Sequence, residues 1–193
     1  EALRVAHRLD RETSGLLLVA RTKPAESALK KAFARRLIKK RYLAIVHGQL
    51  ELDGEVLVLD QPIGAADGIV RVRMALRPES EGGLTARTEV RVLKRLPHHT
   101  LVECRPHTGR QHQIRVHLAA HGFPIVGDKL YPDEDLFIRW AEEGDEAIAD
   151  QVALPRHALH AAGISFPHPR SGQSVTFSAD LPSDLTRFLA GLI

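Results

Sequence analysis

The sequence predicts an α+β domain with a mainly antiparallel sheet. Predicted strands outnumber predicted helices and do not alternate regularly with them, which disfavours a doubly wound parallel sheet. No internal repeat, low-complexity tract or Gly/Ser linker divides the 193 residues, of which 44% are hydrophobic and 26% charged. This length and composition are typical of one domain with a sizeable core. We therefore expect a single domain over residues 1–193.

The first two elements are a strand and a basic helix. Residues Leu16–Arg21 form a short apolar run after the turn-forming Thr13–Gly15, which predicts a buried strand. A helix is predicted over Ala25–Lys40, with Thr22 as its cap and Pro24 in its first turn. Its apolar residues follow helical spacing: Ala25, Ala28, Leu29, Ala32, Phe33 and Leu37.

The remaining elements are mostly strands. Short or alternating apolar segments predict strands at Arg41–Gly48, Val70–Leu76, Ala86–Arg95, Thr100–Arg105 and Val175–Phe177. Three helices are predicted at Arg110–His121, which Gly122 ends, at Leu136–Glu143 on the surface, and at the end of the chain after a Ser183 cap.

Charge is distributed unevenly along the chain. Residues 1–132 hold 23 Lys and Arg against 14 Asp and Glu, a net charge of +9, whereas residues 133–193 hold 4 against 10, a net charge of −6. This asymmetry indicates a polyanionic partner for the first part, although a basic surface can also serve solubility alone. The longest apolar runs are too short for a transmembrane helix, and we expect no membrane partner. The single Cys104 is read as a core thiol and suits a reducing, cytoplasmic compartment.

The segment His7–Gly15 concentrates chemically active side chains before the first predicted strand. Asp10 stands between Arg8 and Arg11, and opposite charges nearby favour an ionised carboxylate. Such a carboxylate can act as a nucleophile or a general base. Asp, Thr, Ser and Gly are also turn formers, so Asp10 could instead serve only its own turn.

Four segments resemble motifs of one enzyme family. The segment His7-Arg8-Leu9-Asp10-x-x-Thr13-Ser14-Gly15 resembles the signature of RNA pseudouridine synthases of the RluA type. Further matches follow in the family's order at 40–48, 105–118 with its continuation to Asp128, and 159–169. The resemblance implies the pseudouridine synthase fold, a mixed, mainly antiparallel sheet with flanking helices around a catalytic cleft. Members carry strands before the first motif, so we expect this chain to lack its N-terminal strands and any upstream RNA-binding domain.

The same resemblance implies three active-site residues. Asp10 would be the catalytic carboxylate, attacking either C6 of the uracil or C1′ of the ribose. Tyr42 would be the pocket tyrosine, although without the motif an aromatic on a predicted strand is more often a core residue. Arg115 would pair with Asp10, and Arg8 would enter the RNA where the target base leaves.

RNA, either ribosomal or transfer RNA, is the expected partner, and we expect a monomer that needs no cofactor. The isomerisation moves one glycosidic bond within a uridine, which must first flip out of the RNA. The candidates for phosphate contacts are Arg110 and the basic residues of the predicted helix, Lys30, Lys31, Arg35 and Lys39. The alternative for that helix is a solvated basic face. A non-catalytic RNA-binding module is the second functional hypothesis.

Eleven histidines raise a metallohydrolase as a third hypothesis. His117 and His121 are one helical turn apart, and His112 is nearby. However, the glutamate of a His-Glu-x-x-His motif is replaced by Leu118, and there is no second cysteine. We therefore expect these histidines to bond to backbone or RNA and expect no metal site.

Overall fold

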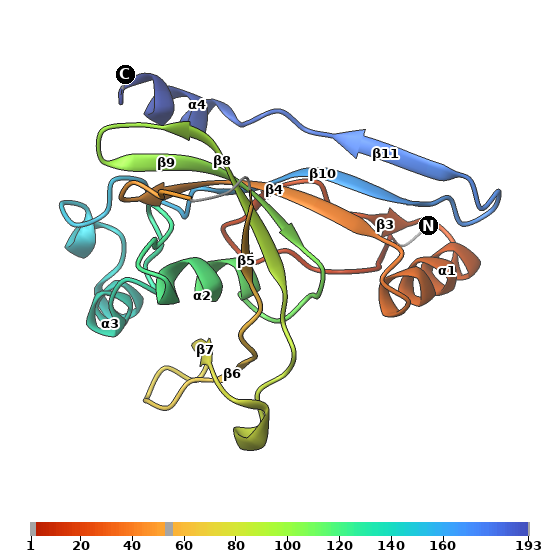
Figure 1. Cartoon of the computed structure of the whole chain (residues 1–193), viewed down its shortest axis with the longest axis horizontal. Helices are drawn as coiled ribbons and strands as arrows, with labels where there is room; N and C mark the ends of the chain where they lie inside the picture. The colour runs from red at the N-terminus through yellow and green to blue at the C-terminus, as the bar shows by residue number, and fades with distance from the viewer. Residues whose placement is uncertain (1–2, 53–55, 193) are drawn as a thin grey trace.

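A long, mostly antiparallel sheet organises the chain (Figure 1), and the computed structural model describes residues 3–52 and 56–192. The strands of this sheet are β2 (Ser14–Gly15), β4 (Lys39–His47), β5 (Leu57–Leu59), β8 (Thr88–Arg95), β9 (His99–Pro106), β10 (Leu159–Pro167) and β11 (Ser174–Ser178). Two small ribbons lie beside it, one of β1 (Arg4–Val5) with β3 (Val19–Ala20), the other of β6 (Ile63–Ala65) with β7 (Met74–Leu76).

The strand order of the sheet is β11-β10-β4-β9-β8-β5. Every pair along this path is antiparallel. The two residues of β2 pair in parallel with His160 and Ala161 of β10, on the side of β10 where β11 pairs further along. The predicted α+β class with a mixed, mainly antiparallel sheet is confirmed.

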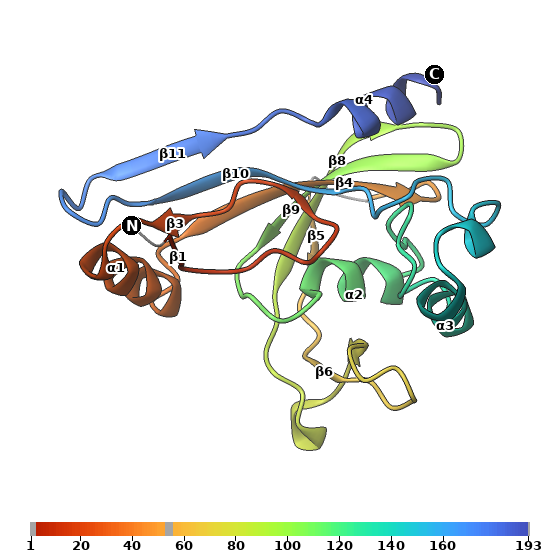
Figure 2. The same cartoon turned by 180° about the vertical axis from the view of Figure 1, so that it is seen from behind.

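Four α-helices flank the sheet: α1 (Lys23–Ala34), α2 (Gln113–Ala120), α3 (Glu134–Glu143) and α4 (Ser183–Ala190). Figures 1 and 2 show α1, α2 and α3 on one side of β4 and β10, and α4 on the other, near β8 and β9. Within residues 3–52 and 56–192, no helix is both long enough and apolar enough to cross a bilayer.

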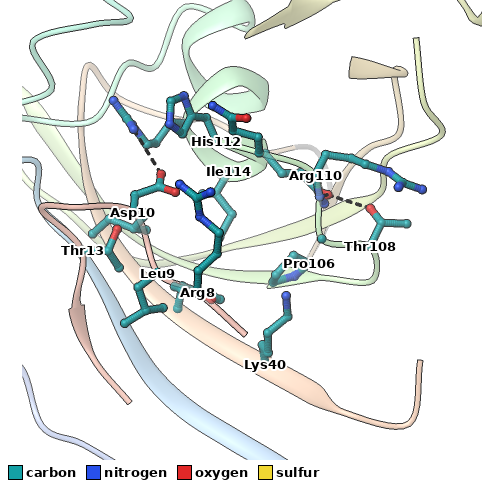
Figure 3. Close-up of a pocket in the computed structure, with 16 residues that line it drawn as sticks. Arg8, Leu9, Asp10, Thr13, Lys40, Pro106, Thr108, Arg110, His112 and Ile114 are labelled. Carbon is teal, nitrogen blue, oxygen red and sulfur yellow. Dashed lines mark hydrogen bonds and ion pairs between the residues drawn. The ribbon is translucent and has the colours of Figure 1, made fainter. Parts of the chain in front are cut away.

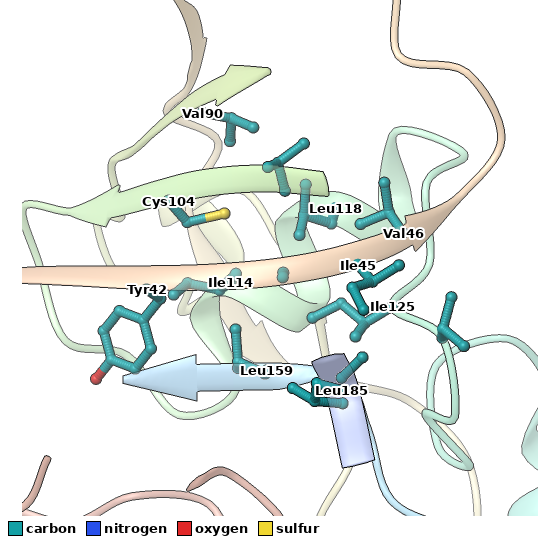
Figure 4. Packing of buried hydrophobic residues seen from close by; sticks show 14 of the residues in the cluster. Tyr42, Ile45, Val46, Val90, Cys104, Ile114, Leu118, Ile125, Leu159 and Leu185 are labelled. Atoms are coloured by element: carbon teal, nitrogen blue, oxygen red, sulfur yellow. The ribbon is translucent and has the colours of Figure 1, made fainter. Parts of the chain in front are cut away.

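The main hydrophobic core lies between the central strands and α2 (Figure 4). Ile45 of β4, Val102 of β9 and Leu118 of α2 are each at most 1% exposed, and Leu185 of α4 closes the cluster from the other side. Cys104 is fully buried here, so its interpretation as a core thiol is confirmed. Because buried branched side chains fix their packing partners, this core holds α2 at a set position against the strands.

The predicted basic helix is shorter than its sequence indicates. Thr22 does cap α1, and Pro24 is in its first turn, but the helix ends at Ala34 rather than Lys40. Arg36 takes a left-handed backbone with φ 57°, which stops the helix, and Ile38 is then buried. Lys39 and Lys40 belong to β4, because pairing with β10 overrides their helix propensity.

The segment predicted as a buried strand at Leu16–Arg21 is also different. Only Val19 and Ala20 pair as a strand, and Leu17 and Val19 are more than 40% exposed. The segment runs along the surface, and its side chains alternate between exposed and inward-facing positions. Although the run is apolar, only one of its two faces is therefore covered.

Smaller corrections concern element ends. Within the predicted strand Val70–Leu76, Arg73 closes a turn on Val70 and only β7 is extended. The helix predicted from Arg110 begins three residues later, as α2. Ser183 was predicted as the cap of the last helix, but it is the first residue of α4. Pro182 takes the cap position and forms no side-chain hydrogen bond there. The strands predicted at 41–48, 86–95, 100–105 and 175–177 and the helix at 136–143 are confirmed.

Candidate active site

Asp10 lies on a loop whose two ends are tied together. The loop leaves the sheet region after β1 and returns at β3, and these two strands pair with each other. His7 reinforces the closure because its Nε2 accepts a hydrogen bond from the backbone N–H of Leu18 at 2.9 Å. Burial lowers the pKa of His7, which keeps this nitrogen free to accept. His7 therefore holds the loop rather than taking part in chemistry.

The far side of the loop is anchored to the chain after α2. The Glu12 carboxylate accepts a hydrogen bond from the Lys129 ammonium at 2.7 Å. The Thr13 hydroxyl is 2.8 Å from Nε2 of His157. Burial is the main cause that lowers the pKa of His157 to about 4, so this imidazole is neutral at pH 7. Asp10 thus stands on a loop fixed from both ends.

Arg115 joins Asp10 to a second, fully buried carboxylate. Its Nε and Nη2 donate to the two oxygens of Asp128 at 2.7 and 2.9 Å, while its Nη1 donates to Asp10 at 3.1 Å. Asp128 is held in turn by the backbone N–H groups of Leu130 and Tyr131. The Arg115 guanidinium lowers the pKa of Asp128 and overcomes the effect of its burial. A bidentate fork of this kind fixes the guanidinium plane, so the remaining nitrogen is aimed at Asp10.

Aromatic packing fixes the same guanidinium from another side. The ring of Tyr131 lies 4.9 Å from the Arg115 guanidinium carbon, a cation–π arrangement. The Tyr131 hydroxyl accepts from the backbone N–H of Met74 and lies 2.8 Å from Nδ1 of His112. Burial lowers the pKa of His112, so its imidazole is neutral at pH 7 beside the phenol. The surroundings of Arg115 are therefore satisfied and rigid.

A cavity of about 190 Å³ opens in front of Asp10 (Figure 3). Its walls include Asp10, Arg8, Tyr42 and Arg115, with Ile114 at the apolar floor. Pockets for drug-sized ligands begin at about 300 Å³, so this cavity suits a single small ring system.

Tyr42 stands between the core and the cavity. Its ring belongs to the main hydrophobic cluster, and in Figure 4 its hydroxyl points away from Cys104 and Ile45. Burial, with a smaller contribution from Asp10, raises the pKa of Tyr42 to about 12. The phenol therefore stays protonated at neutral pH and offers a flat ring and an O–H donor. Both interpretations of Tyr42, core aromatic and pocket wall, apply to the same side chain.

The comparison with known proteins identifies the family. The family model described as RNA pseudouridylate synthase matches residues 1–120. The chain belongs to this family. The expected resemblance to RluA-type pseudouridine synthases is thereby confirmed.

Relatives and solved structures agree with this membership. The chain is 42% identical over 189 residues to "Ribosomal large subunit pseudouridine synthase D" of Nitrosomonas europaea, covering 97% of this chain and 51% of that protein. It is 39% identical over 181 residues to the protein of the same name in Zymomonas mobilis, covering 94% and 53%. The chain thus spans about half the length of these relatives. The solved structure of human RNA Pseudouridylate Synthase Domain Containing 4 matches with a TM-score of 0.80 and 27% identity, covering all of this chain and 76% of that one.

In this pseudouridylate synthase chain, the structure brings together some of the sequence-predicted residues. Asp10, Tyr42, Arg115, Arg8 and Arg110 all line the cavity, although as many as 105 residues separate Asp10 from Arg115. The four other candidates do not line it: Lys30, Lys31, Arg35 and Lys39. The first three are exposed on α1 or at its end, and the last is exposed on β4, not on the helix where it was predicted.

Of the three histidines predicted to bond to backbone or RNA, His117 and His121 contact backbone carbonyls, whereas His112 contacts the Tyr131 hydroxyl. Nδ1 of His117 is 2.9 Å from the Thr88 hydroxyl and its Nε2 is 3.0 Å from the carbonyl of Gln61, while His121 contacts the His117 carbonyl. In the part of the chain that the structure describes, no three His, Cys, Asp or Glu side chains gather as a metal site would require. These side chains fix α2 to β8 and the segment before β6.

The sequence analysis gave no role to Asp128. It follows Gly127 in the matched motif, where an aspartate after glycine reads as an ordinary turn residue. The available signal was its place two residues after Val126, which is fully buried, because a charged residue next to a core segment needs a partner.

Proposed function

We propose that this chain carries the catalytic centre of an RNA pseudouridine synthase. The observation that carries the proposal is a carboxylate, Asp10, aimed by a rigid Arg115–Asp128 pair into a small cavity with an aromatic wall. Family membership supports the reaction class.

The reaction sets physical requirements that this site meets. The N1–C1′ bond of a uridine breaks and a C5–C1′ bond forms, while the hydrogen on C5 is replaced by one on N1, so no net oxidation or group transfer occurs. The detached uracil must be retained until it rejoins the ribose, which requires a cavity that fits one base and excludes bulk water. A cavity of about 190 Å³, lined in part by Ile114 and the Tyr42 ring, has room for one base.

Each residue then has a role. Asp10 supplies the carboxylate that attacks or stabilises the reacting nucleoside. Arg115 orients Asp10 and balances its charge, and the neutral phenol of Tyr42 packs against the base and offers its proton as a hydrogen bond. Arg8 fills the place that the flipped base leaves in the RNA, because it reaches the cavity mouth beside Asp10.

The proposed substrate is a uridine in structured RNA, ribosomal or transfer RNA, bound by a monomer in the cytoplasm. The names of the Nitrosomonas and Zymomonas relatives favour large-subunit ribosomal RNA. The basic residues Lys30, Lys31, Arg35 and Lys39, together with Arg110, would add contacts to RNA phosphates.

The decisive experiment replaces Asp10 with asparagine. Asp10→Asn should abolish pseudouridine formation in total RNA under single-turnover conditions while RNA binding, measured by filter retention, stays within a few-fold of wild type. Asp67→Asn is the matched control, because that carboxylate is 95% exposed and contacts only Arg77 among ion-pair partners in the described chain. Continued isomerisation by Asp10→Asn would refute the proposal.

A second measurement separates the enzyme from a non-catalytic RNA-binding module. Pseudouridine mapping of ribosomal and transfer RNA, with and without the gene, should show at least one site that disappears and returns on complementation. RNA binding by the wild-type protein without any such site would favour the binding module.

A further inference from the structure

Lys40 points from β4 towards the active-site cavity, although it was predicted to be on a helix. Side chains two residues apart on a strand share a face, so Lys40 lies beside Tyr42, whereas Lys39 lies on the opposite face and is exposed. Lys40 lines both the cavity in front of Asp10 and a second cavity of about 340 Å³. Figure 3 shows its amine turned towards Pro106.

This lysine carries its charge without a counter-ion. In the structure of residues 3–52 and 56–192, the side-chain ammonium of Lys40 forms no ion pair and donates no hydrogen bond, and burial lowers its pKa. Lys129 offers a contrast within the same chain, because its buried ammonium is bonded to Glu12 and to the carbonyl of Pro155. The Lys40 side chain is half-buried, so an ammonium that lines a cavity without an ionic partner is available to bind an anion there.

The second cavity extends this cationic environment. Arg36 at the end of α1 and the loop from Pro106 to Arg110 form its walls, and no carboxylate side chain lines it. Gly109 lies next to the Lys40 ammonium, since a Cβ there would be 3.6 Å from Nζ, an ordinary van der Waals distance. The two cavities share five residues: Lys40, Pro106, Thr108, Gly109 and Arg110. A chain of nucleotides that places one base in the first cavity therefore finds a cationic path into the second.

We propose that Lys40 binds a phosphate that flanks the target uridine, and that the second cavity receives the adjoining RNA backbone. This inference rests on the proposed function, because the substrate in the first cavity is taken to be a uridine in RNA. A phosphate fits the observations because the lysine ammonium is a compact point charge that binds phosphate oxygens without needing a planar partner. Asp10 is not that counter-ion, since Arg115 engages it.

The test removes the lysine charge and the phosphate charge separately. Lys40→Gln and a control variant, Lys94→Gln, are each combined with a synthetic stem–loop RNA taken from the mapped site. Lys94 is exposed on β8 and lines neither cavity. The RNA is prepared in three forms: unmodified, with one uncharged methylphosphonate on the 5′ side of the target uridine, and with one on its 3′ side. The dissociation constant and the single-turnover rate are measured for each pair.

If Lys40 binds one of the two phosphates, the effects of removing the lysine charge and that phosphate charge should not add. Lys40→Gln should weaken binding of unmodified RNA by about tenfold to a hundredfold, in line with the loss of a charge-assisted hydrogen bond. With one of the two methylphosphonate RNAs, wild type and Lys40→Gln should bind alike, which identifies the phosphate. Lys94→Gln should change the binding of all three RNAs by the same small factor.

Two outcomes would overturn the inference. One is a Lys40→Gln effect of equal size on all three RNAs, and the other is no effect on any of them. Thermal unfolding supplies a further readout, because removal of an unpaired cation should leave the melting temperature unchanged or raised. A clear fall would show that Lys40 stabilises the fold instead. Wild-type protein that binds the RNA but forms no pseudouridine would refute the proposed function alone, since the binding comparison still tests Lys40.

Discussion

The replacement Asp128→Asn tests whether the buried fork positions Arg115, the arginine that contacts Asp10. Both carboxylate oxygens of Asp128 accept hydrogen bonds from Arg115, and one also accepts from the backbone N–H groups of Leu130 and Tyr131. An asparagine amide has one oxygen and one NH₂ group, so either orientation directs N–H donors at an Arg115 N–H group. The substitution therefore removes one acceptor and creates a repulsive contact in a fully buried place.

The burial of Asp128 sets the expected loss of unfolding free energy. Breaking one partner of a buried ion pair costs about 3–5 kcal/mol, and because Arg115 keeps its bond to Asp10 we expect the lower end, about 3 kcal/mol. Release of the guanidinium also misplaces Asp10, and a displacement of about 1 Å reduces rates about 100-fold. Urea unfolding measures the first effect. Single-turnover pseudouridine formation on folded protein measures the second.

A second fork in the chain provides the control. Arg156 donates to both oxygens of Asp184 at 2.7 and 3.0 Å, almost the same geometry, but the Asp184 side chain is 33% exposed. Asp184→Asn should cost at most about 1 kcal/mol, because solvent screens this pair, and the rate should be unchanged. Equal losses of stability in the two variants, or a loss below 1 kcal/mol for Asp128→Asn, would refute the reasoning.

Three further predictions concern pH, backbone strain and salt. The pKa of His157 is about 4 in the folded chain against an ordinary 6.5, so the unfolded chain binds more protons between these values and stability falls as the pH drops from 6.5 to 4. The fall amounts to about 3 kcal/mol, and urea titrations of His157→Gln should show a flatter pH dependence than wild type. Gly15→Ala should cost about 3 kcal/mol or more in urea unfolding, because φ is +106° and a Cβ would lie 2.3 Å from the carbonyl oxygen of Ala161; a cost below 1 kcal/mol would contradict this. Replacing Lys30 and Lys31 with glutamine should make the plot of log binding constant against log salt shallower by about 1.5, and an unchanged slope would assign them to a solvated face.

Local sequence patterns predicted the central strands well and the basic helix less well. The strand predicted at 41–48 contains the apolar run 42–46, and the structure starts it two residues earlier and ends it at His47. At residues 35–40, good helix formers favour a helix, but pairing of Lys40 with Ile164 and burial of Ile38 stabilise the extended form. Such tertiary contacts are not visible in a local window, so the helix end was misplaced.

The active site divides in a similar way. Asp10 could be singled out as a carboxylate between two arginines, but its contact with Arg115 spans 105 residues and came only from the family resemblance. The roles of Asp128 and Lys40 were not predicted, because each depends on what the fold places opposite it. Long-range pairs of this kind are set by how β10 and α2 pack, which no local spacing encodes.

The pairing of β2 with β10 has a consequence for how substrate is captured. Two residues of the loop that bears Asp10 are part of the hydrogen-bond ladder of the sheet, and the next N–H, that of Leu16, also donates to Ala161. Opening this loop therefore means breaking sheet structure, an event as rare as subglobal unfolding rather than a nanosecond fluctuation. We expect the protein to meet its ligand as a stiff template, so that the conformational change, and its energetic barrier, belong to the nucleic acid.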